Sequence, residues 1–358
     1  MRAVISIGAG YGQRALIHAA RQLGYKVVAV DRAPANDTLA LLDDVIVVST
    51  YDIDTVIELL LPYKQRYDFC AVFARTSGPA LLTAAKVADI FGLPGLPSMF
   101  VNAAVSKSEL RRQAQSLQIA TPQGVCVTDG RIPEIKPPWV VKPDMPLVGK
   151  QNVYKVSAEI GFHTAYVSAS DESYNDTVDV ELFTAGLDVG YMAIVYQGKI
   201  EHGMLYDEFV SFQSNKAQGI GVAAPSLFCN TDIELYCLAT ADAFIRRWQY
   251  QAGFAFFSFR LSKQGEILLY EVNPGLCGDA IADQLLPALW PGFNPFVCEA
   301  NLLLGNRPEQ PVSANGQYLI IGGKLIRVSD LEGYFSAVSK TQGGSDIVAM
   351  SRWFLKNT

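Results

Sequence analysis

The chain has 358 residues, of which 50% are hydrophobic and 18% charged, and its formal net charge is −6. This length predicts two or three domains, and the composition excludes an intrinsically disordered protein. The net charge is negative and no Lys/Arg cluster is present, so we expect no nucleic-acid partner. No apolar run approaches the ~20 residues of a membrane helix, so we expect no membrane partner.

The N-terminal segment predicts a Rossmann-like α/β domain with a parallel sheet, because short apolar runs alternate with helical spacing. We expect its elements in this order: strand 3–7, helix 15–23, strand 26–30, strand 44–48, helix 53–61, strand 70–73 and helix 80–91. Arg75 follows the last strand directly, on the usual ligand side of such a sheet. It is a candidate for substrate binding, with a surface salt bridge as the alternative.

The first turn, residues 8–13, is close to a dinucleotide-binding fingerprint, and Asp31 stands where a ribose would be held. The fingerprint G-x-G-x-x-G needs a third glycine where Gln13 stands, and Gly12 falls one place early. A helix N-terminus without a nucleotide is therefore the better interpretation. An NAD(P)-dependent oxidoreductase that uses this turn and Asp31 is the alternative.

The central segment brings a lysine to the end of a buried strand. We expect a helix at 105–117, an irregular stretch at 124–136, and a strand at 139–142 that Lys142 closes. Burying an ammonium group without a partner is costly, so Lys142 must reach a counter-charge or water. Residues 143–156 predict a loop between two strands.

The second half predicts mainly β-structure. Glu181 lies in an otherwise apolar strand, and Asp188 follows a turn. We expect the elements in this order: strands 177–183, 190–196 and 199–205, helix 233–248, a hairpin of 253–261 and 266–272, helices 279–286 and 296–304, and two or three short strands from 317 on. The six scattered cysteines predict buried thiols of a cytoplasmic protein.

The hairpin ends in a candidate metal site. Glu271 and Asn273 are two residues apart on one strand, so their side chains point to the same side. A carboxylate and an amide oxygen form a pair suited to Mg²⁺. A polar strand end before the turn at Pro274 is the alternative.

Taken together, these segments resemble the ATP-grasp superfamily over nearly the whole chain. The motifs follow the family's order: an SK helix start at Ser106 and Lys107, an I-x-T-P turn at 119–122, a VVKP strand at 140–143, an E-x-x-x-x-G-x-D segment at Glu181, Gly186 and Asp188, and EVNPG at 271–275. The resemblance implies a Rossmann-like domain over 1–98, then two α+β subdomains that clasp the nucleotide. These are a small subdomain with its linker helix over 99–185, and a C-terminal subdomain with the Mg-binding hairpin and tail over 186–358.

The resemblance also implies ATP and Mg²⁺ as cofactors and a role for each site residue. Lys107 and Lys142 would bind the phosphates, and Lys150 would add charge there. Leu182 and Phe183 would form an adenine hinge with Glu181 facing the exocyclic amine, and Asp188 would bind the ribose. Glu271 and Asn273 would bind Mg²⁺, and Arg260 and Lys142 would be the catalytic groups.

The implied activity is that of an ATP-dependent carboxylate–amine ligase. A carboxylate attacks the γ-phosphate of ATP, and an amine or related nucleophile captures the acylphosphate, so that ADP is released. The partners would be a small carboxylic acid and an amine, with a homodimer left open. Position alone suggests Arg32, Arg75, Arg260 and Asp279 as groups near the acid, and the residues do not identify the acid.

Several departures from the family pattern favour a second interpretation. Ser258 stands where an acidic metal ligand is usual, thirteen residues before Glu271, which predicts one bound Mg²⁺ and not two. Phe256 replaces an arginine common in dipeptide-forming relatives, the phosphate loop keeps only Gly149, and no arginine follows Pro274. The second interpretation is an ATP-grasp-fold protein with a degenerate metal site that acts as a nucleotide-binding or partner subunit.

Overall fold

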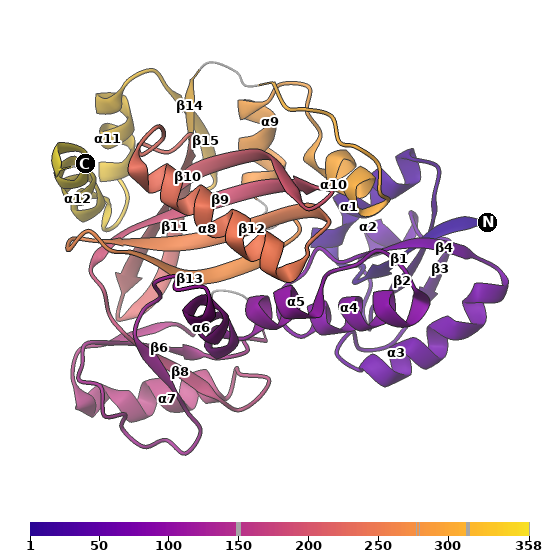
Figure 1. Cartoon of the computed structure of the whole chain (residues 1–358), viewed down its shortest axis with the longest axis horizontal. Helices are drawn as coiled ribbons and strands as arrows, with labels where there is room; N and C mark the ends of the chain where they lie inside the picture. Colours follow the sequence, from indigo (N-terminus) through magenta and orange to yellow (C-terminus); the bar gives the residue numbers. More distant parts are fainter. Residues whose placement is uncertain (148–151, 277, 279, 313–315, 358) are drawn as a thin grey trace.

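The computed structural model describes residues 1–147, 152–276, 278, 280–312 and 316–357. Two β-sheets organise the chain, a parallel sheet near the N-terminus and a larger antiparallel sheet (Figure 1). The N-terminus and the C-terminal helices lie at opposite ends of the molecule (Figure 1). Within the described residues, no helix has both the length and the apolar character needed to cross a membrane.

The N-terminal part is the predicted parallel sheet, with strand order β3-β2-β1-β4. Its elements are β1 (Arg2–Ile7), α1 (Arg14–Gln22), β2 (Lys26–Val30), α2 (Asn36–Leu39), β3 (Asp44–Ile46), α3 (Ile53–Leu60), β4 (Asp68–Phe73) and α4 (Ala80–Phe91). Helices α3 and α4 pack on one face, and α1 packs on the other. Burial on both faces explains why these strands are continuous apolar runs.

Side chains of the chain itself hold the glycine turn after β1. The Asp31 carboxylate accepts hydrogen bonds from the backbone N–H of Ala9 and of Ala33, both at 2.8 Å. Gly8 has φ 101°, which favours glycine, and the Gln13 side chain lies against it. Gln13 also donates to the Arg75 carbonyl at 2.6 Å. The two residues that decide the dinucleotide interpretation are therefore engaged within the fold.

The large sheet has strand order β13-β12-β9-β10-β11-β7-β6-β8-β5, and a β14–β15 hairpin extends it from β11. Its strands are β5 (Gly124–Val127), β6 (Trp139–Pro143), β7 (Tyr154–Val156), β8 (Val178–Leu182), β9 (Gly186–Tyr196), β10 (Lys199–Gln213), β11 (Lys216–Ala224), β12 (Ala252–Ser262), β13 (Ile267–Pro274), β14 (Gln317–Ile321) and β15 (Lys324–Val328).

The helices around this sheet separate into groups that cover its different parts (Figure 1). They are α5 (Ser98–Val105), α6 (Lys107–Ser116), α7 (Phe162–Ser170), α8 (Asp232–Trp248), a π-helix (Ala280–Leu285) that runs into α9 (Leu286–Leu289), α10 (Pro295–Leu303), α11 (Leu331–Ser339) and α12 (Gly344–Asn357). Helix α7 packs on β6 and β8, while α5 and α8 share a core with β9 and β12.

Side chains along β12 point alternately to the two faces of the sheet, and this alternation determines which of them face the cavity side. Phe257 and Phe259 face α5 and α8, where Trp248 stacks on Phe100 at a ring separation of 4.0 Å. Phe254 and Phe256 point to the other face, toward α1 and α10. Because side chains alternate with a period of two, the next members of this second row are Ser258 and Arg260.

Several elements differ from the sequence-based expectation. The strand expected at 199–205 continues to Gln213, and its acidic residues Asp207 and Glu208 accept hydrogen bonds from hydroxyl groups. The strand expected at 190–196 begins at Gly186, so Asp188 lies within β9. Elements α2, α5, β5, α7, β11, α11 and α12 were not expected. Among the described cysteines only Cys237 and Cys298 are buried, and Cys126 is exposed, so the expectation of uniformly buried thiols is wrong.

Candidate active site

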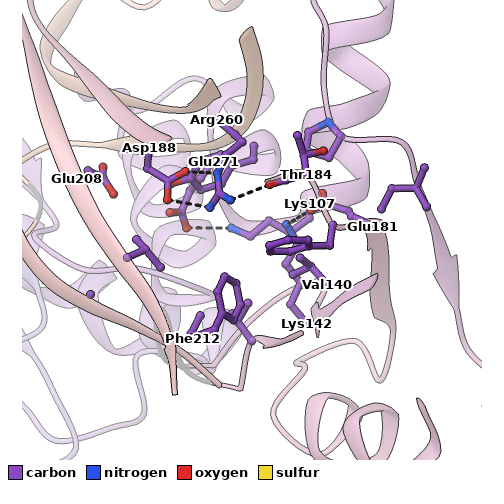
Figure 2. Close-up of a pocket in the computed structure, with 18 of the residues that line it drawn as sticks. Lys107, Val140, Lys142, Glu181, Thr184, Asp188, Glu208, Phe212, Arg260 and Glu271 are labelled. Atoms are coloured by element: carbon purple, nitrogen blue, oxygen red, sulfur yellow. Dashed lines mark hydrogen bonds and ion pairs between the residues drawn. The ribbon is translucent and has the colours of Figure 1, made fainter. Parts of the chain in front are cut away.

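A cavity of about 150 Å³ opens between the part of the sheet that carries β6 and β8 and the part that carries β9 to β13 (Figure 2). The structure brings most of the predicted site residues into its wall: Lys107, Lys142, Glu181, Leu182, Phe183, Asp188, Arg260 and Glu271. They come from six elements or their ends, so sheet pairing positions them more than local sequence does.

One end of the cavity is apolar. Val140 and Leu182 line it, and so does Phe183, whose ring packs edge-on against Phe212 at 5.6 Å. The backbone N–H groups of Leu182 and Phe183 donate to the carbonyls of Gln123 and Pro138 at 2.8 and 2.9 Å. These two residues therefore offer the cavity their side chains, while their N–H groups are already bonded.

A buried network of four charges lies behind this wall. Lys142 donates to Glu181 at 2.7 Å and lies 3.6 Å from Asp179. Arg111, on α6, bonds the same two carboxylates, at 2.5 Å to Asp179 and 3.2 Å to Glu181. The set balances two cations against two anions, which buried charges require.

Burial and charge act differently on the members of this network. Burial raises the pKa of Asp179 to about 7, and the charge of Glu181 adds to the rise. Burial also opposes ionisation of Glu181, but Lys142 and Arg111 outweigh it and hold the pKa of Glu181 below its usual value. Burial disfavours the Lys142 ammonium, yet the two carboxylates raise its pKa above the usual range. Lys142 is thus a cation at neutral pH, and Asp179 is the carboxylate that accepts a proton first.

The opposite end of the cavity is polar, and ion pairs cross it (Figure 2). Lys107, the first residue of α6, donates to Glu271 at 3.0 Å. Arg260 bonds both carboxylate oxygens of Asp188, at 2.5 and 2.8 Å, and donates to the Thr184 carbonyl at 2.9 Å. A ligand that binds Lys107, Glu271 or Asp188 must therefore exchange or share these bonds.

A carboxylate that sequence reasoning missed also lines this end. Glu208, on β10, is 7% exposed and accepts hydrogen bonds from the hydroxyls of Ser258 at 3.1 Å and Tyr206 at 3.2 Å. Glu208, Val210 and Phe212 all line the cavity at two-residue spacing. That alternation, continued past residue 205, is the signal that could have identified it.

Comparison with known proteins adds the fold family. No protein-family model matches the chain, and no curated protein matches it. Solved structures do match. One is an L-amino acid ligase from Bacillus licheniformis, with 18% identity and a TM-score of 0.73, and the match covers 89% of this chain and 79% of that chain. Another is an ADP complex of N5-carboxyaminoimidazole ribonucleotide synthetase, with 14% identity and a TM-score of 0.71, and the match covers 89% of this chain and 81% of that chain. A third is the biotin carboxylase domain of 2-oxoglutarate carboxylase from Hydrogenobacter thermophilus with MgADP. It has 15% identity and a TM-score of 0.67, and the match covers 89% of this chain and 74% of that chain.

The chain has the ATP-grasp fold. The fold expected from the motif order is thereby confirmed: an N-terminal parallel sheet followed by the α+β parts that form an ATP-grasp cavity. At these identities the likeness establishes the fold, and the activity has to be argued from the cavity.

Some of the predicted site residues lie away from the cavity wall. Asn273 lies two positions beyond Glu271 on β13, opposite Phe256, and is half-buried outside the described lining. Arg32 is exposed at the end of β2. Arg75 donates to the carbonyls of Gly12 at 2.5 Å and Leu276 at 3.3 Å, so it links the parallel sheet to the segment after β13. Lys150, Gly149 and Asp279 lie outside the described residues.

Arg111 is another residue that sequence reasoning missed, as is its partner Asp179. It lies four residues after Lys107 on α6, and residues at this spacing share a helix face. The spacing was visible in the sequence. Its partners Asp179 and Glu181 lie in β8, about seventy residues further on, so the network itself depends on tertiary contact.

Proposed function

We propose that the chain is an ATP-dependent ligase that activates a carboxylate as an acylphosphate and joins it to an amine or related nucleophile, with release of ADP. The observation that supports this most is the convergence of Lys107, Lys142 and Glu271 beside an apolar slot within one cavity. Ammonium groups suit phosphates, a carboxylate suits Mg²⁺, and apolar walls suit a purine ring.

The nucleotide would lie along the cavity with its base at the apolar end. Val140, Leu182 and Phe183 would enclose the ring, and Glu181 would face its exocyclic amine. Lys142 is fixed between buried carboxylates and would meet the phosphates as a positioned cation. The solved structures with ADP and with MgADP support this choice of ligand for the fold.

The donor set at the polar end fits Mg²⁺. Glu271 offers carboxylate oxygens to the cavity, and Asn273, half-buried on the same strand outside the lining, would add an amide oxygen. Within the described residues, no three His, Cys, Asp or Glu side chains lie close enough to form a metal site by themselves. Phosphate oxygens and water would therefore complete an octahedral shell. When bound, Mg²⁺ supplies charge neutralisation at the β- and γ-phosphates.

Residues of the chain have defined tasks in the reaction. An incoming polyphosphate would draw Lys107 away from Glu271, so that the metal could replace this ion pair. An oxygen of the acid substrate then bonds to the γ-phosphorus as the bridge to ADP breaks. The amine nitrogen attacks the acyl carbon, phosphate leaves, and the nitrogen loses a proton. Lys107 and Lys142 would oppose the charge on the phosphates, and Arg260 would oppose the charge on the acyl oxygen.

The same proposal includes the domain boundaries at residues 98 and 185, a small carboxylic acid and an amine as substrates, and a cytoplasmic location. A homodimer also belongs here. The matching biotin carboxylase structure is a domain dimer, which supports this part of the proposal.

A second candidate is a nucleotide-binding partner subunit with reduced catalysis. Ser258 and the buried Phe256, which packs in the core near Tyr206 where some relatives carry an arginine, favour it. The oxidoreductase alternative has less support, because Asp31 and Gln13 are bonded within the glycine turn.

A hydroxylamine trap tests the ligase directly. The protein is incubated with ATP, Mg²⁺, hydroxylamine and a panel of carboxylic acids, because hydroxylamine converts an acylphosphate into a hydroxamate, which added iron(III) turns into a coloured complex. We expect a hydroxamate with at least one acid, together with ADP, and neither product from Glu271→Gln. ATP binding without ADP or hydroxamate for any acid would favour the partner-subunit function instead.

A further inference from the structure

We propose that the hydroxyl of Tyr270 donates a hydrogen bond to a ribose hydroxyl of the bound nucleotide, so that the cavity selects ribonucleotides over their deoxy forms. This inference rests on the proposed function, since the ribose belongs to the nucleotide of the same cavity. It assigns a role to a residue that stands directly before Glu271 and belongs to none of the sequence motifs.

A β-bulge in β13 places Tyr270 outside the regular strand pairing. Ser258 of β12 is opposite Glu271 of β13. The next residue of β12, Phe259, is opposite Leu269. The pairing thus advances by two residues on β13 for one residue on β12, and Tyr270 is the extra residue. Such bulges change the direction in which a side chain points.

The bulge turns two adjacent side chains of β13 to the same side. Leu269 and Val272 both pack in the core that β13 shares with α5 and α8, although they are three positions apart. In a regular strand, residues at an odd separation point to opposite faces. The extra residue accounts for the difference, because Tyr270 and Glu271 both line the cavity. A regular strand would have turned one of them away.

Tyr270 lies where the two ends of the cavity meet. Arg260 donates to the carbonyl of Thr184, which follows the apolar wall in sequence, and bonds both carboxylate oxygens of Asp188 (Figure 2). Tyr270 adjoins Glu271 at the polar end and lines the same cavity as Asp188. Burial raises the pKa of Tyr270 well above its usual range, and among the nearby carboxylates Asp188 adds most to that rise. Because a ribose joins the base to the phosphates, we place it beside Asp188 and Tyr270.

The hydrogen-bonding needs of a ribose hydroxyl and of these two side chains are complementary. Within the part of the chain that the structure describes, the Tyr270 hydroxyl makes no hydrogen bond to the protein. A polar group in a partly buried cavity is costly without a partner, and a ligand oxygen would supply one. A ribose hydroxyl can donate its proton to the Asp188 carboxylate and accept a bond from the Tyr270 phenol at the same time.

The preference among three ribose forms tests this assignment. Titration calorimetry with Mg²⁺ measures the affinities for ADP, 2′-deoxyADP and 3′-deoxyADP, which differ only in a ribose hydroxyl and are not consumed in the proposed reaction. The native protein should bind at least one deoxy form about tenfold more weakly than ADP. Tyr270→Phe, which removes only the hydroxyl, should weaken ADP binding about fivefold and leave the affinity for that deoxy form nearly unchanged. The preference for ADP should therefore narrow by the same factor.

Tyr196→Phe is the matched control. Tyr196 ends β9, is partly exposed and lies outside the cavity lining. This variant loses the same phenolic hydroxyl from another strand of the large sheet. It should bind all three nucleotides like the native protein.

The outcomes separate this inference from the proposed function. If the native protein binds ADP but does not distinguish the deoxy forms, or if Tyr270→Phe keeps the native preference, the inference is wrong and the proposed function is unaffected. If the native protein binds neither ADP nor ATP, both are wrong. Should Tyr270→Phe fail to fold, a crystal structure of the native protein with ADP decides. A hydrogen bond from Tyr270 to a ribose oxygen supports the assignment, and a hydroxyl directed away from the ribose contradicts it.

Discussion

Three cations at the cavity are already paired with carboxylates: Lys107 with Glu271, Lys142 with Glu181, and Arg260 with Asp188. Without ligand, the charges that would bind a nucleotide therefore neutralise each other. Nucleotide and metal would divide these pairs, with phosphates taking the ammonium groups and metal taking Glu271. For these three cations, binding then exchanges existing ion pairs, which limits the desolvation cost.

The buried network predicts a pH effect on stability. The pKa of Asp179 is raised to about 7 in the fold against about 3.8 unfolded, so the folded protein binds one more proton between these values. The free energy of unfolding should therefore fall as pH rises from about 4 to 7, by at most ~1.4 kcal/mol per pH unit from this group. Asp179→Asn should remove that part of the slope.

Urea unfolding at pH 5, 6, 7 and 8 measures this slope for the native protein and the variant. The comparison must be between the two proteins, because burial also raises the pKa of Glu299 to about 8 and gives a slope of the same sign. Parallel curves for the two proteins over pH 5 to 7 would show that Asp179 is ionised throughout.

The motif residues were predictable one at a time, and their partners were not. Lys142 was identified because it closes an apolar strand, and Glu271 because a hairpin and turn surround it. Arg111, Asp179 and Glu208 have their effect only through contacts between distant segments. A local pattern cannot specify such contacts, because it contains the spacing within an element but not the packing between elements.

At the scale of elements, the site depends on close approach between neighbouring strands of the large sheet. Gly186 starts β9 where a Cβ would meet the Leu261 carbonyl at 2.0 Å, and Gly190 makes room for Tyr206. These glycines let β9 lie between β10 and β12 while side chains cross over it. Sequence analysis placed a turn before Asp188, and the role of both glycines followed only from the strand pairing.

Gly190→Ala tests this element-level role. The added methyl group overlaps the Tyr206 ring, so we expect the free energy of unfolding to fall by ~1–3 kcal/mol, the usual cost of overpacking. Gly219→Ala is the matched control, because Gly219 is also in a strand and a Cβ there meets no atom within 4 Å. Urea unfolding gives both values. Equal stabilities for the two variants would contradict the packing described for Tyr206.

At the scale of the whole molecule, the parallel sheet is joined to the segment after β13, and Asp31 and Gln13 of its glycine turn are hydrogen-bonded within the fold. Arg75 connects the two by bonding carbonyls of Gly12 and Leu276. Parallel order and helix positions in the N-terminal part were predictable from apolar periodicity. The C-terminal helices were not, because their polar and apolar residues serve contacts with β10, such as the bond from Tyr334 to Asp207 at 2.8 Å.

Asp31→Ala tests the separation of these two parts. Loss of the carboxylate leaves two backbone N–H groups without their acceptor, so stability should fall by ~1–3 kcal/mol. ATP affinity should stay unchanged in titration calorimetry, and the native protein should show no thermal shift with NAD(P)H. A native NAD(P)H shift that the variant loses would restore the oxidoreductase interpretation.

The central claim is that the cavity between β8 and β12 binds ATP through Lys142, and titration calorimetry with a non-hydrolysable ATP analogue and Mg²⁺ tests it most directly. We predict saturable one-to-one binding to the native protein and a loss of about 1–3 kcal/mol of binding free energy in Lys142→Met, the scale of a charge-assisted hydrogen bond. Lys199→Met, an exposed lysine of β10, is the control and should bind like the native protein. No saturable binding to the native protein, or equal affinity in a folded Lys142→Met, would contradict the account.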